Sequence, residues 1–288
     1  MSSIWRPVRE RNPTRSLMAV IAHPGDEAFG FGGAIAQAAA SGAYVVVLCA
    51  TRGHFDRRLL ERAPAPGGRN RHYSNPTVWR NLDTVREDEM RRSVALLGVR
   101  VLRMLDYAEE GLSAVPFDEL VGRIVEPIRM HRPEVILTFG PDGVTGDDDH
   151  VAIGRATEAA FERAGQPLAY EDDLDEDQVA WRAAKLYHLV VPASRVAATG
   201  ASAPVGYGSP DADDALTVEL GELAQLKLAA IGRHVSQTGS DGPFRDWSDE
   251  SRDAFLATEH YRLARSNLPT PAGSAPAVME ASLWDGLG

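Results

Sequence analysis

Two short segments combine imidazole and carboxylate side chains at spacings that suit a metal ion. The first is AHPGDE, residues 22–27, whose proline and glycine favour a turn that brings His23 and Asp26 together. The second, residues 140–150, holds four aspartates and ends in His150. Zinc in catalytic sites takes three nitrogen or oxygen ligands and keeps one position for water. His23, Asp26 and His150 are therefore the candidate ligands, with Zn²⁺ expected and another divalent ion as the alternative.

These residues also have structural interpretations. A histidine at a strand end is often hydrogen-bonded without a catalytic role, and aspartates before a helix cap its N-terminus. We expect at least one of the aspartates at 147–149 to be such a cap. Asp147 and Glu27 are the candidate catalytic residues: Asp147 lies three residues before His150, where it would serve as a base or a fourth ligand. Glu27 is expected to brace the ligand loop as a hydrogen-bond acceptor.

The elements around these segments predict how they are positioned. Apolar runs predict strands over residues 17–22, 44–50, 99–105, 135–139 and 185–191. Amphipathic patterns predict helices over residues 29–41, 81–97, 117–132, 151–164 and 216–235. This alternation predicts an α/β fold, a three-layer, Rossmann-like, mostly parallel sheet with helices on both faces. Ligands bind beyond the carboxyl ends of such strands, where both segments fall.

The domain organisation follows from composition along the chain. Residues 1–15 read as a polar N-terminal extension, 16–270 as a single domain and 271–288 as a flexible tail. Residues 53–78, rich in glycine, proline, arginine and asparagine, are predicted to form a long loop.

Charge and cysteine content exclude several functional classes. A net charge of −11 over 288 residues argues against a nucleic-acid partner. The single cysteine, Cys49, excludes disulfide scaffolds and CxxC metal sites, and its apolar neighbours predict a buried residue and not a nucleophile. No apolar run approaches the length of a membrane span. We expect a cytoplasmic protein acting on a small molecule; a homo-oligomer is left open.

The order of the motifs resembles one family. The segments AHPGDE, FGFGGAIA, VVVLCATRG, REDEMRRSVALLGV and DGVTGDDDHVAIG follow one another as in the PIG-L/LmbE-like metal-dependent N-deacetylases. These include the de-N-acetylase of N-acetylglucosaminyl-phosphatidylinositol and the deacetylase and amidase of mycothiol metabolism. The resemblance covers residues 17–164 and resumes at 185–187 and 227–237. It implies a metal-dependent amide hydrolase acting on an N-acyl amino sugar or a related small conjugate.

The resemblance also implies roles for single residues. It assigns the three metal ligands to His23, Asp26 and His150. An arginine and an acidic residue of the family help to hold the sugar, and they match Arg86 and Glu109, with Glu110 as the alternative if the alignment slips by one. Both would otherwise be solvated surface charges.

Two positions depart from the family pattern. The family's general base, the first aspartate of its His-Pro-Asp-Asp-Glu motif, is Gly25 here, and glycine cannot take a proton. The histidine that steadies the family's tetrahedral intermediate is Asp147 here. Three outcomes follow: a rearranged deacetylase with Asp147 as base, a different reaction that uses the metal as a Lewis acid, or binding without turnover.

A function from another class rests on the glycine run at residues 30–33. Glycines after a strand can cradle the phosphates of a nucleotide. The run lacks the GxGxxG spacing, however, and AHPGDE is no phosphate cradle, so a nucleotide-binding α/β protein is a weaker hypothesis than the amide hydrolase or the metal-binding relative with altered chemistry.

Overall fold

A seven-stranded sheet forms the centre of the molecule in the computed structural model, which describes residues 15–55, 81–170, 179–192, 215–238, 244, 247–269 and 280–288. The strand order is β3-β2-β1-β4-β5-β7-β6. The first five strands are mutually parallel, and β7 runs antiparallel to both β5 and β6. The strands are β1 (Ser16–Ile21), β2 (Tyr44–Phe55), β3 (Val101–Glu109), β4 (Val135–Phe139), β5 (Lys185–Val190), β6 (Leu216–Glu219) and β7 (Thr258–Ser266).

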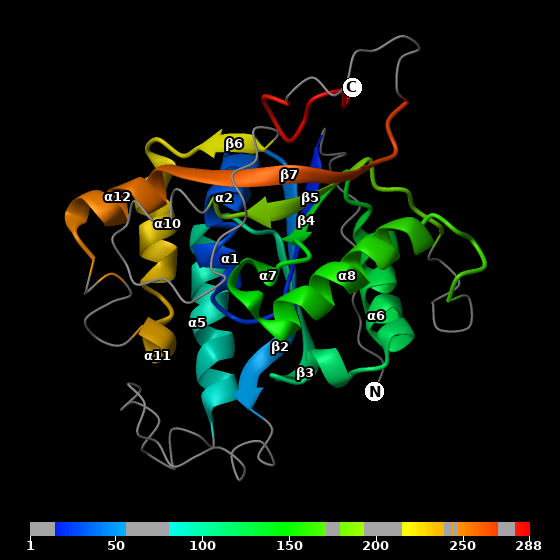
Figure 1. Ribbon diagram of the computed structural model, residues 1–288, viewed down its shortest axis with the longest axis horizontal. Coiled ribbons are helices and arrows are strands. Elements are labelled where there is room, and N and C mark those ends of the chain that lie inside the picture. Colours follow the sequence, from blue (N-terminus) through cyan, green and yellow to red (C-terminus); the bar gives the residue numbers. More distant parts are fainter. Residues whose placement is uncertain are drawn as a thin grey trace.

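Helices cover both faces of this sheet. Figure 1 shows α6 and α8 on one face and α2, α5 and α10 on the other. The α-helices are α1 (Asp26–Phe29), α2 (Gly32–Ala40), α5 (Leu82–Leu96), α6 (Phe117–His131), α7 (Gly143–Gly146), α8 (Asp148–Arg163), α10 (Leu223–Ile231), α11 (Val235–Thr238) and α12 (Asp249–Ala257). A 3₁₀ turn, η2, spans Leu112–Ala114. Among the described residues, no helix is long and apolar enough to cross a bilayer.

The predicted three-layer α/β architecture is therefore confirmed. Every residue of β1, β4 and β5 is buried, as expected of parallel strands that are covered on both faces. The predicted strand at 135–139 matches β4, and the predicted helices at 81–97 and 117–132 match α5 and α6 to within one residue at each end.

The helix predicted over residues 29–41 is wrong at its start. The chain forms the single turn α1, changes direction at Phe31 and begins α2 at Gly32. The break lets Phe31 bury its ring edge-on against Phe139 on β4, with 5.2 Å between ring centroids.

The helix predicted over residues 216–235 is also wrong in part. Its first four residues form β6, in which buried and exposed side chains alternate, and the helical part is divided between α10 and α11. The sequence analysis also missed β7 and α12. β7 carries four charged or histidine side chains among nine residues, and the apolar residues of α12 are confined to its last four positions, so neither shows the periodic apolar pattern by which the other elements were predicted.

Two boundary predictions need correction. Residues 53–55 continue β2 and do not begin a loop, whereas residues 56–78 of that prediction lie outside the described residues. The tail predicted at 271–288 is wrong for its last nine residues, because Leu283 is buried and Glu280 forms an ion pair with the buried Lys185. The N-terminal extension lies outside the described residues except for Arg15.

Candidate metal centre

The candidate ligands meet at the point where the strand order reverses. From β1 the chain adds β2 and β3 on one side and β4 and β5 on the other, so the carboxyl ends of β1 and β4 mark the topological switch point where ligands of such sheets bind. His23 and Asp26 follow β1, and His150 lies in the first turn of α8 after β4. One ligand atom from each lies within 4.8 Å of the others. The three residues that the sequence predicts as ligands therefore lie next to one another in the structure.

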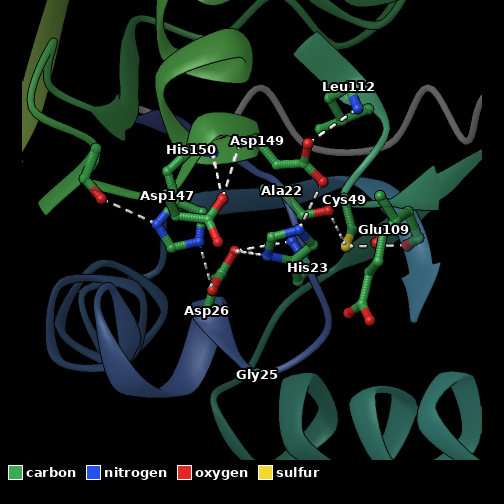
Figure 2. Close-up of polar contacts among 12 residues, drawn as sticks. Ala22, His23, Gly25, Asp26, Cys49, Glu109, Leu112, Asp147, Asp149 and His150 are labelled. Carbon is green, nitrogen blue, oxygen red and sulfur yellow. Dashed lines mark hydrogen bonds and ion pairs between the residues drawn. The ribbon is translucent and has the colours of Figure 1, made fainter. Parts of the chain in front are cut away.

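Each imidazole is oriented by a hydrogen bond from the ring nitrogen that faces away from the other candidate ligands. His23 donates from Nε2 to the Asp149 carboxylate at 3.0 Å, and His150 donates from Nδ1 to the Gly143 carbonyl at 3.0 Å. Their other nitrogens, Nδ1 of His23 and Nε2 of His150, lie 3.9 Å and 3.4 Å from the Asp26 carboxylate (Figure 2). Histidine ligands in metal sites are oriented in this way, so the residues present fit a divalent ion.

Electrostatics at the site favour a cation. Burial alone would lower the pKa of His23, but the hydrogen bond to Asp149 and the charges of Asp26 and two other acids raise it to about 9. Burial would raise the pKa of Asp26, but His150 and His23 lower it. A field that holds a proton on His23 against the cost of burial attracts a metal ion for the same reason.

Asp147 caps α8 and faces the ligands. Its Oδ1 accepts the backbone N–H groups of Asp149 and His150 at 2.9 Å and 3.1 Å, which confirms that one of the three aspartates is a helix cap. Within the part of the chain that the structure describes, Oδ2 of Asp147 accepts no hydrogen bond. Figure 2 shows this carboxylate beside the His150 ring, above Asp26. A proton acceptor is thus available next to the ligand group.

Glu27 lies behind the ligand turn, fully buried. One of its oxygens accepts the backbone N–H of Gly25 at 2.9 Å, and the other lies 2.6 Å from Nε2 of His234. Gly25 itself has φ +111° and ψ −35°, a conformation that side chains disfavour. The turn between the two ligands of AHPGDE is therefore fixed by Glu27 and made possible by glycine.

Arg86 and Glu109 form a buried ion pair and are not solvated surface charges. They are 3% and 5% exposed, and Nη1 of Arg86 lies 2.5 Å from the Glu109 carboxylate. Arg86 also donates to the Gly53 carbonyl at 3.1 Å. The charge of Glu109 contributes to the raised pKa of His23, so the pair lies within electrostatic range of the ligands.

The glycine run at residues 30–33 is not open to a phosphate ligand. The N–H groups of Gly33 and Ala34, at the start of α2, donate to the buried Glu259 carboxylate at 2.6 Å and 2.8 Å. A Cβ on Gly33 would lie 2.6 Å from Leu220, so this glycine serves close packing. A carboxylate of the chain already occupies the position that a phosphate would take, which removes the basis for the nucleotide hypothesis.

Asp149 is the residue of the site that the sequence analysis did not single out. Besides holding His23, its carboxylate accepts the backbone N–H groups of Glu110 and Leu112 at 2.7 Å and 2.9 Å. The signal for it was weak, because it is one of three consecutive aspartates and only the fold shows which one points inward. Cys49 is buried as expected, and burial raises the pKa of its thiol well above the usual value.

Comparisons with known proteins show a family and a fold. The model of the PIG-L family, described as GlcNAc-PI de-N-acetylase, matches residues 18–161. The chain is 30% identical to the 1D-myo-inositol 2-acetamido-2-deoxy-α-D-glucopyranoside deacetylase of Geodermatophilus obscurus over 91% of this chain and 96% of that protein.

Solved structures share the fold. The N,N'-diacetylchitobiose deacetylase of Pyrococcus horikoshii superposes with a TM-score of 0.63 at 19% identity, covering 88% of this chain and 86% of that one. The 4-carboxy-2-hydroxymuconate hydratase of Pseudomonas putida superposes with a TM-score of 0.57 at 15% identity, covering 90% and 100%. The fold is thus found in proteins named for hydrolysis and in one named for hydration.

Proposed function

The chain belongs to the PIG-L family, and we propose that it is a metal-dependent N-deacetylase that hydrolyses the amide of an N-acyl amino sugar or a related small conjugate. The observation that carries this proposal is the ligand group, because the outer nitrogens of His23 and His150 are fixed by hydrogen bonds and the inner ones face Asp26. Curated relatives with this domain are named as deacetylases of an N-acetylated glucosamine joined to inositol. That substrate class is the first to test.

Zinc is the ion that we assign to this group. Two imidazole nitrogens and one carboxylate oxygen are a common protein ligand set for catalytic zinc. A divalent ion held by His23, Asp26 and His150 would supply Lewis acidity toward water and the amide carbonyl. The other divalent ions that accept these ligands are alternatives within the same proposal.

The residues of the chain move protons and hold the substrate. In hydrolysis, water adds to the amide carbon, the C–N bond breaks, and a proton passes to the amine nitrogen. Because Gly25 cannot take a proton, we assign both proton uptake and proton return to the free oxygen of Asp147. Glu27 is buried under the turn and braces it without reaching the reacting atoms.

Arg86 and Glu109 are proposed to bind hydroxyl groups of the sugar. Their mutual ion pair holds both side chains in one geometry, and a guanidinium and a carboxylate offer donors and acceptors to a polyol. The pair also remains charge-neutral as a unit, which suits an uncharged sugar.

A second candidate, a metal-binding relative with lost or redirected chemistry, is favoured by one observation. Gly25 replaces the acid that the resemblance assigns as general base, and a missing base lowers the rate roughly 10²- to 10⁴-fold. The alternative predicts a full metal site without amine release.

A substrate panel separates the two candidates. The purified protein is loaded with Zn²⁺ and incubated with N-acetylglucosaminides that differ in aglycone and acyl group, and free amine is measured. Release that is lost in Asp26→Ala and retained in Asp148→Asn, a change at an exposed aspartate of α8, supports the deacetylase. One equivalent of bound metal with no amine from any member supports the alternative.

A further inference from the structure

The space beside Gly25 is filled by a side chain from a distant part of the sequence. A Cβ built on Gly25 would lie 2.8 Å from Oε1 and 3.3 Å from Nε2 of Gln237 in α11. Gly25 is the residue just before the ligand Asp26 (Figure 2). The carboxamide of Gln237 therefore lies against the turn that carries two of the three ligands.

Two buried carboxylates hold α11 in this place. Glu27 pairs with His234, just before α11, and the same carboxylate accepts the N–H of Gly25. Glu89 on α5 accepts both the backbone N–H and the hydroxyl of Ser236, at 2.8 Å and 2.6 Å, and Figure 1 shows α11 beside α5. Because one carboxylate holds both the turn and the segment before α11, buried contacts anchor the backbone of α11 beside Gly25, and the exposed side chain of Gln237 extends from it to the turn.

A carboxamide in this space can orient a molecule but cannot take up its proton. Oε1 accepts a hydrogen bond and Nε2 donates two, but neither atom is basic near neutral pH. An acid introduced at position 25 would meet this carboxamide and would also have to adopt φ +111°, so the chain is built for glycine there. The polar group beside Gly25 is therefore the carboxamide of Gln237, which α11 supplies.

We infer that Gln237 is a positioning residue of the site, whose carboxamide accepts a hydrogen bond from the water that attacks the amide. This inference rests on the proposed deacetylase function. It assigns orientation of the water to Gln237 and leaves proton transfer to another group. Replacing the Gln237 carboxamide by the isosteric carboxylate of glutamate should therefore add a base. The change is made at position 237, which already carries a side chain of this shape, and not at position 25, where the backbone favours glycine.

The test compares Gln237→Glu with Gln237→Met and with a matched control, Gln225→Glu, which makes the same change at an exposed position of α10. With Zn²⁺ bound, Gln237→Glu should raise kcat for amine release roughly tenfold or more near pH 7. Gln237→Met keeps the length of the side chain without its hydrogen bonds and should lower kcat roughly tenfold. Gln225→Glu should match the wild type.

A second readout does not depend on turnover. The visible spectrum of the Co²⁺-loaded protein is titrated with alkali, and its midpoint should rise by about one pH unit in Gln237→Glu, because an added negative charge opposes ionisation at the site. The midpoint should not move in Gln225→Glu. Wild-type rates in both Gln237 variants with an unchanged midpoint would overturn the inference. A wild-type protein that binds Co²⁺ but releases no amine overturns the proposed function instead, and the midpoint alone then decides on Gln237.

Discussion

At the scale of single residues, the geometry of the site depends on the groups that hydrogen-bond to the candidate ligands and to the turn that carries them. The spacing of His23 and Asp26 across a turn and the position of His150 after β4 allowed the ligands to be predicted, because turn chemistry and strand ends are local properties. Asp149 and Gln237 could not be predicted with roles. Asp149 contacts His23 and Gln237 lies beside Gly25, each more than a hundred positions away along the chain. No local sequence pattern indicates that these residues are close in the fold.

The role of Asp149 gives a prediction about metal affinity. Asp149→Asn removes the charge that orients Nε2 of His23, and the affinity for Zn²⁺ should fall about 10- to 100-fold. Competition with a chromogenic chelator measures this. Asp148→Asn, an exposed change at the neighbouring position, should leave the affinity unchanged. Equal affinities in both variants would mean that Asp149 does not orient the ligand.

At the scale of elements, strands with apolar runs were predictable, whereas β7, which has no such run, was missed. Residues 135–139 are apolar except for Thr138, and they form β4 as expected. In β7 the buried side chains include Glu259 and Tyr261, and their burial depends on partners from α2 and α10. Such a strand is recognised only when the elements that satisfy its polar groups are already placed.

The buried pair of Glu259 and Lys227 should make a large contribution to stability. Glu259 accepts two N–H groups of α2 and lies 2.7 Å from Nζ of Lys227, with both side chains 2% exposed. Glu259→Gln leaves the lysine without its counter-charge, and the free energy of unfolding in urea should fall by about 3–5 kcal/mol. The exposed control Glu219→Gln should change it by less than about 0.5 kcal/mol. A small effect at both positions would contradict this account.

The end of α6 should contribute to the dependence of stability on pH. Burial and the nearby charge of Arg103 lower the pKa of His131 from 6.5 to about 4. The unfolded chain therefore binds a proton that the folded chain does not between these values. The contribution of His131 is fully present above pH 6.5 and is lost as pH falls toward 4, by roughly 1–3 kcal/mol.

Replacement of this histidine tests the sign of that effect. In His131→Gln, the free energy of unfolding should fall less steeply between pH 6.5 and 4 than in the wild type. Unfolding in urea at several pH values within that window measures the slope. A steeper fall in the variant, or identical slopes, would show that His131 is not kept neutral by the fold.

At the scale of the whole molecule, the C-terminal segment is part of the domain. Glu280 lies 2.6 Å from Nζ of the buried Lys185 and accepts a hydrogen bond from Tyr187, and Leu283 is buried beside them. Composition suggested a flexible tail because small residues precede this segment. Only the position of Lys185 in a fully buried strand shows that the segment must supply a counter-charge.

Removal of residues 280–288 should therefore destabilise the domain. The truncated chain leaves Lys185 buried without its acid, and the free energy of unfolding should fall by about 3 kcal/mol or more. Lys185→Met in the truncated chain should restore part of this loss, because it removes the unpaired charge. An unchanged urea midpoint after truncation would show that the segment does not anchor to the sheet.

The central claim is that the group formed by His23, Asp26 and His150 holds one metal ion that serves amide hydrolysis. The most direct measurement titrates Zn²⁺ into chelator-treated protein while free amine is recorded from an N-acetylglucosaminide that the wild type accepts. The account predicts a rate that rises linearly and levels off at one equivalent, with no rise in His150→Ala. A rate that is independent of added metal, or equal in the variant, would contradict it.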